Sequence, residues 1–86
     1  MKRFDVRIVA SAGKELAGMP RMLRERIIEK FDEIRKDPRG MDSKRLDDAT
    51  YRVRVGDYRI VYHVNDAEHT VLVTRIRHRR EVYRRR

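Results

Sequence analysis

The stretch TYRVRVGDYRIVYHV, residues 50–64, decides the fold because it has the pattern of a β-hairpin. Gly56 and Asp57 form a short turn signal between two runs that are rich in β-branched and aromatic residues. A two-residue turn at this point places Arg54 directly opposite Arg59 on the neighbouring strand. We therefore predict a hairpin with this register.

The three arginines of this hairpin are predicted to share one face. Arg52 and Arg54 are two residues apart, so both side chains leave the same side of their strand, and Arg59 faces Arg54 across the pair. Like charges that face each other destabilise a sheet unless an anion lies between them. Val53 and Ile60 face each other on the opposite side, which indicates burial. The pattern predicts either a phosphate-sized site or, in the simpler alternative, a row of ordinary solvent-facing charges.

The rest of the chain supplies a strand, two helices and one further strand. Residues 2–9 alternate in hydropathy like an amphipathic strand, and Ser11 is a suitable N-cap for a short helix that ends at Gly18. Residues 21–36 have apolar side chains at helical spacing, and residues 70–76 are again rich in β-formers. The element order predicts a single α+β domain over residues 1–86, with two helices on one face of a small antiparallel sheet of about four strands.

The same patterns predict which residues form the core. Residues 41–49 are expected to form a connecting loop with Leu46 tucked inward. Strict alternation in the last strand places Val71, Val73, Arg75 and Arg77 on one face and Leu72, Thr74 and Ile76 on the other. The predicted core residues are Leu16, Leu23, Ile27, Phe31, Ile34, Val53, Ile60, Tyr62, Leu72 and Ile76.

Charge is the strongest compositional feature of these 86 residues. The formal net charge is +9 and the sequence pI is about 10.6, which favours a polyanionic partner such as RNA, DNA, anionic lipid or an acidic protein. The sequence has no cysteine, no long apolar run and no signal-peptide pattern, so we expect a cytosolic protein without disulfides or a membrane span.

Several kinds of active site are not expected. The sequence has no Gly-rich phosphate loop and no dinucleotide fingerprint. Its three histidines have no familiar zinc spacing, and the acidic pair Asp47-Asp48 lies in a predicted loop beside Arg45, so we expect neither a metal nor another cofactor.

Cleavage of RNA without a metal remains possible for such a chain. The 2′-hydroxyl of the substrate can attack the adjacent phosphate if a base takes its proton and cations stabilise the charge that develops. Arginines suit the second task but not the first, because they remain protonated. The candidates for proton transfer are His78, Tyr83 and, less favoured, His63.

The sequence YRVRVGDYRIVYHV, followed by a strand and then by RHRREVY, resembles the RelE toxins of the RelE/ParE superfamily over nearly the whole chain. The resemblance implies a compact α+β fold and a metal-independent endoribonuclease that cuts messenger RNA in the ribosomal A site. It also implies partners, namely the ribosome, its messenger RNA and a cognate antitoxin, with no membrane and no small-molecule cofactor.

Carried over residue by residue, the resemblance implies a catalytic set that consists of Arg52, Arg54, Arg59, His78, Arg79 and Tyr83. Relatives often have lysine at the first two of these positions, and the choice between Arg77 and Arg79 stays open, although the HRREVY match favours Arg79. The remaining candidates are basic residues expected to contact the RNA backbone, and these are Lys44, Arg45, Arg75, Arg77 and Arg80.

Two other functions compete with the ribonuclease. A toxin of the ParE type shares the fold but poisons DNA gyrase, and it needs neither the basic cluster nor the terminal tyrosine. A non-catalytic RNA- or protein-binding module with the same fold is compatible with arginine in place of lysine at positions 52 and 54.

Overall fold

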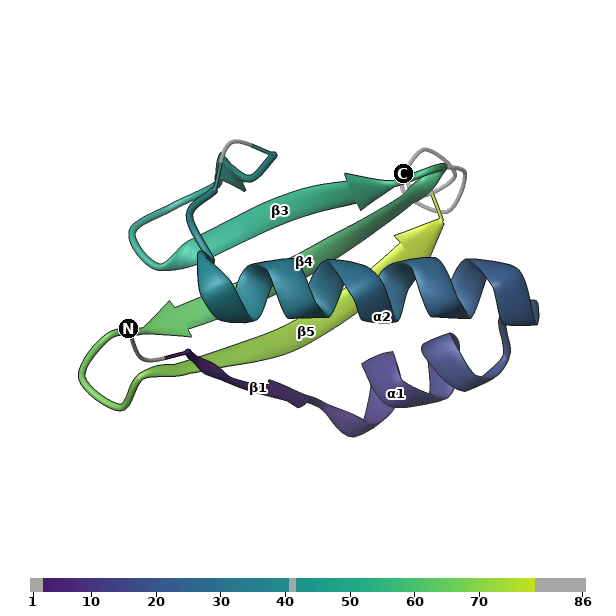
Figure 1. Ribbon diagram of the computed structural model, residues 1–86, viewed down its shortest axis with the longest axis horizontal. Coiled ribbons are helices and arrows are strands. Elements are labelled where there is room, and N and C mark those ends of the chain that lie inside the picture. The colour runs from purple at the N-terminus through teal and green to yellow at the C-terminus, as the bar shows by residue number, and fades with distance from the viewer. Residues whose placement is uncertain (1–2, 41, 79–86) are drawn as a thin grey trace.

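The chain folds into one mixed β-sheet with two helices on one side of it (Figure 1). A computed structural model of the protein describes residues 3–40 and 42–78. The elements are β1 (Asp5–Ile8), α1 (Ala10–Ala17), α2 (Arg21–Lys36), β2 (Lys44–Arg45), β3 (Thr50–Val55), β4 (Tyr58–Asn65) and β5 (Thr70–His78). Neither helix is long and apolar enough, over the residues described, to cross a membrane.

The α+β class is confirmed, but the sheet differs from the prediction in two ways. It has five strands in the order β1-β5-β4-β3-β2, and the extra strand is the two-residue β2, which was predicted as loop. The sheet is also not wholly antiparallel, because β1 runs parallel to β5. Alternation within residues 2–9 indicates a strand but contains no information about its partner, which lies more than 60 residues along the chain.

The long helix α2 has the predicted bounds. It begins after Pro20, which has an extended backbone, and it ends before Pro38. Its apolar stripe is buried against the sheet through Ile27, Phe31 and Ile34. The short helix α1 ends at Gly18 as predicted, but it begins at Ala10, so the expected cap Ser11 lies inside it.

The core lies between α2 and one face of the sheet. Leu16 and Leu23 are half-buried and pack against it, whereas Leu72 is 40% exposed and its placement in the core was wrong. The predicted core residues that are buried are Ile27, Phe31, Ile34, Val53, Ile60, Tyr62 and Ile76.

A β-bulge in β5 explains the error at Leu72. Val61 of β4 pairs with Arg75, but the next residue, Tyr62, pairs with Val73, so Thr74 is an extra residue in β5. The Thr74 hydroxyl donates a hydrogen bond to the Val61 carbonyl oxygen at 3.3 Å.

Because of the extra residue, the alternation of side chains between the two faces of the sheet is reversed after the bulge. Val71, Val73 and Ile76 are buried toward the helices, while Arg75 and Arg77 are exposed on the other face. The predicted grouping of the two valines with the two arginines on one face was therefore wrong.

Candidate nucleic-acid interface

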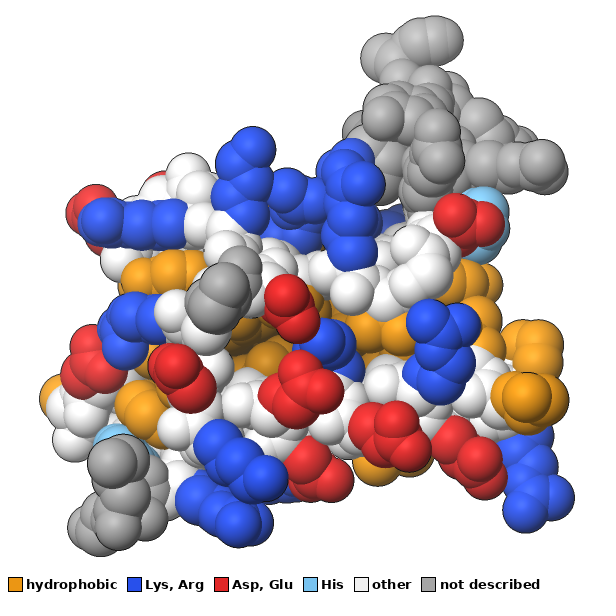
Figure 2. Space-filling view, turned by 45° about the horizontal axis from the view of Figure 1, so that its top comes forward, with side chains coloured by type: hydrophobic (Ala, Val, Ile, Leu, Met, Phe, Trp, Pro, Cys, Tyr) orange, Lys and Arg blue, Asp and Glu red, His pale blue; other side chains and the backbone are white. Residues whose placement is uncertain are grey.

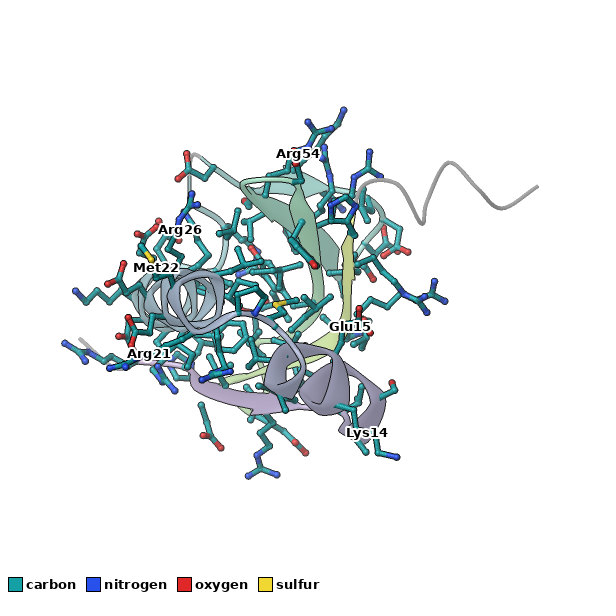
Figure 3. The ribbon with its side chains drawn as sticks, turned by 90° about the vertical axis from the view of Figure 1, so that its right-hand side faces the viewer. Lys14, Glu15, Arg21, Met22, Arg26 and Arg54 are labelled. Atoms are coloured by element: carbon teal, nitrogen blue, oxygen red, sulfur yellow. The ribbon has the colours of Figure 1, made fainter. Side chains whose placement is uncertain are left out.

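The hairpin formed by β3 and β4 has the predicted register. Arg54 pairs with Arg59 and Val53 pairs with Ile60. The turn between the strands contains Gly56 with a φ of 59°, a conformation that glycine adopts without a steric penalty. The three hairpin arginines therefore share the face of the sheet opposite α1 and α2, and Figure 3 shows Arg54 pointing away from both helices.

Cross-strand pairing extends the hairpin arginines into two rows of side chains on this outer face, because residues directly opposite each other share a face. The first row runs from β3 to β5 and consists of Arg54, Arg59 and Arg77. The second row runs from β2 to β5 and consists of Lys44, Arg52, Val61 and Arg75.

These two rows and Leu46 line an open groove of about 470 Å³, which we call the cationic groove. Six of its eight lining residues are Lys or Arg, and none is acidic. Figure 2 shows Lys and Arg side chains gathered along the upper edge of the molecule, above a face on which acidic and basic side chains are mixed. The groove is therefore suited to a polyanion.

Four arginines of the groove lack the ion pairs that other described basic residues make. Across residues 3–40 and 42–78, no carboxylate forms an ion pair with Arg52, Arg54, Arg59 or Arg75. On α2, by contrast, Lys30 binds Glu33 at 2.9 Å.

Partial burial, followed by the charges of Arg54 and Arg59, holds the pKa of Arg52 below its usual value. An anion in the groove would relieve this repulsion, which favours binding of a phosphate.

Two candidate RNA contacts in the β2 region lie in different places. Lys44 lines the groove, but Arg45 pairs with the buried Tyr51 and so lies on the opposite side of β2. The Arg45 guanidinium donates to the carbonyl oxygen of Asp47 at 3.1 Å and to the carboxylate of Asp48 at 3.4 Å. The structure thus brings Lys44 to the groove, whereas the Arg45 side chain is bonded to the loop that follows β2.

The candidates for proton transfer are also separated. His78 pairs with Tyr58, whose other neighbour Val55 is buried, so the His78 ring lies on the helix side of the sheet end. The two rings meet edge to face with centroids 5.0 Å apart. His63 lies on the outer face, in the row next to Val61. The remaining site predictions, Arg79, Arg80 and Tyr83, lie outside the described residues.

Two apolar residues of the groove were not predicted as part of a site. Val61 is two residues from Arg59 in the same strand and so shares its face, a signal that was present in the sequence. Leu46 was expected to point inward, but it is 51% exposed and lines the groove. Together they provide apolar surface between the cations, against which a sugar or base can pack.

The described residues contain no cluster of three or more His, Asp or Glu side chains that could hold a metal ion. The groove itself offers permanent positive charge and hydrogen-bond donors but no group that takes a proton at neutral pH. The arrangement can therefore bind a phosphodiester and stabilise negative charge on it, and a reaction there needs its base from another residue.

Comparison with known protein families gives one match that spans most of the chain. The family model described as "ParE toxin of type II toxin-antitoxin system, parDE" matches residues 6–83. Among curated proteins, Toxin RelG of Mycobacterium tuberculosis is 29% identical over 85 residues, which cover 95% of this chain and 98% of that protein.

Solved structures of similar fold include two RelE proteins. The archaeal RelE–RelB complex from Pyrococcus horikoshii matches with a TM-score of 0.81 and 26% identity, over 90% of this chain and 96% of that one. A doubly substituted E. coli toxin RelE in the free state matches with a TM-score of 0.79 and 27% identity, over 96% and 92% of the two chains.

Proposed function

The chain belongs to the family of ParE toxins of type II toxin–antitoxin systems, within the RelE/ParE superfamily, and from that premise we propose that it is a metal-independent endoribonuclease that cuts messenger RNA in the ribosomal A site. The observation that carries the proposal is the cationic groove, with its six Lys and Arg residues and no acid. Such an enzyme acts where ribosomes are, in the cytoplasm.

The groove suits the chemistry of RNA cleavage by the substrate's own 2′-hydroxyl. Attack of this oxygen on phosphorus concentrates negative charge on the phosphate oxygens in the transition state. Arg52, Arg54 and Arg59 supply permanently charged, planar donors that bind two oxygens at once. Removal of one donor of this kind typically slows a reaction by about 100-fold to 1,000-fold.

The proposed partner in the resting cell is an acidic antitoxin. Solved relatives include the RelE–RelB complex of Pyrococcus horikoshii and the RelB–RelE complex of Methanococcus jannaschii. The net charge of +9 and a groove lined by six Lys and Arg residues and no acid favour a partner whose carboxylates occupy the same positions as RNA phosphates.

A second candidate function follows from the matched family model itself, which is described as a ParE toxin. Poisoning of DNA gyrase would make the cationic groove a surface for DNA or for an acidic protein, without cleavage. In that case the purified toxin inhibits gyrase supercoiling and leaves translated messenger intact.

Primer extension on messenger RNA from a reconstituted translation reaction tests the proposal. Antitoxin-free protein is compared with Arg52→Gln and Arg59→Gln, and Arg21→Gln is the matched control because that exposed arginine of α2 already pairs with Glu25. We expect discrete cuts from the wild type and the control, reduced about 100-fold in the two groove variants. The absence of cuts from folded wild type would overturn the proposal, and a gyrase supercoiling assay would then test the second candidate.

A further inference from the structure

A third row of side chains borders the cationic groove on the outer face. It runs from β3 to β5 and consists of Thr50, His63 and Leu72. His63 is exposed, and it is the one histidine on this face within the part of the chain that the structure describes. His63 is two residues from Val61 in β4, so their Cα atoms are about 7 Å apart.

The histidine is attached to a short chain of hydrogen bonds. Its Nδ1 atom lies 3.3 Å from the Thr50 hydroxyl oxygen. The Asp47 carboxylate accepts hydrogen bonds from the backbone amides of Ala49 at 3.3 Å and Thr50 at 3.1 Å. The Thr50 side chain, followed by the backbone amide of Ala49, holds the pKa of Asp47 below its usual value.

The contact with Thr50 engages Nδ1 of the imidazole and leaves Nε2 as the other ring nitrogen. A hydroxyl has one hydrogen, and when Thr50 directs it to Asp47, the Thr50 oxygen acts as acceptor toward His63. The proton of neutral His63 then lies on Nδ1, and Nε2 carries the free lone pair. An exposed nitrogen of this kind is available to take a proton from a bound molecule.

We infer that His63 is the general base of the reaction, with its Nε2 taking the proton of the substrate 2′-hydroxyl, while Thr50 and Asp47 position the ring. The inference rests on the proposed function. Arg52 and Arg75 flank Val61 in the adjacent row, so a phosphate held between them lies one row from the imidazole. The arginines cannot take this proton, and His78 lies on the other side of the sheet.

The step balances without a cofactor. The O–H bond of the 2′-hydroxyl breaks and its proton moves to Nε2, while the oxygen forms a bond to phosphorus. The bond between phosphorus and the 5′-oxygen then breaks, and that oxygen takes a proton from solvent. The products are a 2′,3′-cyclic phosphate and a 5′-hydroxyl.

The charged groups around His63 come from three strands and one loop. Asp47 approaches through Thr50, and Arg52 of β3 and Arg75 of β5 lie in the neighbouring row. Arg7 of β1 lies beyond Leu72 and is paired with Asp5 at 3.0 Å. Both signs of charge therefore face the imidazole, and a general base acts only in its neutral form, which a higher pH favours.

The test measures single-turnover cleavage of messenger RNA bound to the ribosome, from about pH 5.5 to about pH 8.5, a range that spans ordinary histidine titration. Wild type is compared with His63→Gln, with His63→Ala in the absence and presence of free imidazole, and with the control His69→Asn in the turn after β4. We expect a wild-type rate that rises with pH. The rate should be about 100-fold lower at neutral pH and independent of pH in His63→Gln. It should recover partly when imidazole is added to His63→Ala.

Thermal denaturation separates these effects from misfolding, and Thr50→Val tests the positioning role. This variant should retain cleavage but at a reduced rate, because the imidazole can still take a proton but is no longer held in position by the Thr50 hydroxyl. If the wild type cuts RNA and His63→Gln cuts with the same rate and pH profile, the inference is overturned while the proposed function stands. A wild-type rate that falls with rising pH, with loss in His63→Gln, would make His63 a cationic contact and also overturn it. If the wild type cuts nothing, the proposed function fails first.

Discussion

The two faces of the sheet are formed by the same strands, but they have opposite chemistry. On the inner face Val53, Ile60 and Ile76 form a cross-strand row that is buried under α2. On the outer face the adjacent residues Arg54, Arg59 and Arg77 form a parallel row of cations in an open groove. The comparison teaches that burial ties the inner residues to stability, whereas the exposed outer residues are open to a partner, as the proposed function requires.

Truncation of the inner row should have the largest effect on folding. Ile60 is fully buried, so Ile60→Ala removes apolar contacts and leaves a cavity. We expect the free energy of unfolding to fall by about 2–5 kcal/mol, measured by urea denaturation. The neighbouring Arg59→Ala should change it by less than about 0.5 kcal/mol. Equal losses in the two variants would contradict the division between the faces.

Removal of one cation from the outer row should affect RNA binding and not stability. Arg54 faces Arg59 directly, so Arg54→Gln removes a like-charge contact and should leave the free energy of unfolding unchanged or slightly higher. RNA affinity should decrease, and the slope of log affinity against log salt should become shallower by about 1. Fluorescence titrations at several salt concentrations measure both. An unchanged slope would show that Arg54 makes no phosphate contact.

The buried hydroxyl of Tyr62 makes the stability contributed by the inner face depend on pH. Tyr62 donates a hydrogen bond to the Pro38 carbonyl oxygen at 2.6 Å, and burial raises its pKa to about 12. Unfolded tyrosine titrates near pH 10, so this contribution to stability is full below about pH 10 and is lost as the pH rises toward 12. Tyr62→Phe should cost about 1–2 kcal/mol at neutral pH. The free energy of unfolding of this variant, measured by denaturation, should also fall less than that of the wild type between these pH values.

The smallest effect is expected at Leu72, on the outer face. Because it is 40% exposed, Leu72→Thr should change the free energy of unfolding by less than about 0.5 kcal/mol. The adjacent Val71 is fully buried, and Val71→Thr should cost about 1–3 kcal/mol because it buries a hydroxyl. Thermal denaturation of the two variants side by side measures the difference. The reverse order would contradict the position of the bulge.

Local patterns predicted the parts of the fold that depend on nearby residues. The bounds of α2 and the register of the β3–β4 hairpin follow from helical spacing, two prolines and a Gly-Asp turn. The parallel pairing of β1 with β5 joins distant segments, and the bulge in β5 breaks strict alternation without a Gly or Pro to mark it. Neither has a signal within a short window of sequence.

The candidate site was predictable to a similar degree. The hairpin arginines come together as their spacing indicated, and Lys44, which was expected in a loop, joins them through the short strand β2. Arg45 does not join them, since β2 was not predicted and its alternation was therefore unknown. His63 was less favoured than His78 because a position near the edge of the predicted sheet indicated an ordinary exposed side chain, and its contact with the Thr50 hydroxyl joins two strands.

The bulge at Thr74 has a consequence for how this sequence can change over evolutionary time. A single added residue in β5 allows one strand to supply Val71 and Val73 to the core and then Arg75 to the groove. Loss of that residue would reverse the facing of every position on one side of it, turning cations inward or valines outward. Many substitutions along β5 can accumulate one at a time, but a one-residue deletion there would remove stability and binding together. Sequence comparisons within such proteins should therefore treat gaps in this strand as more informative than mismatches.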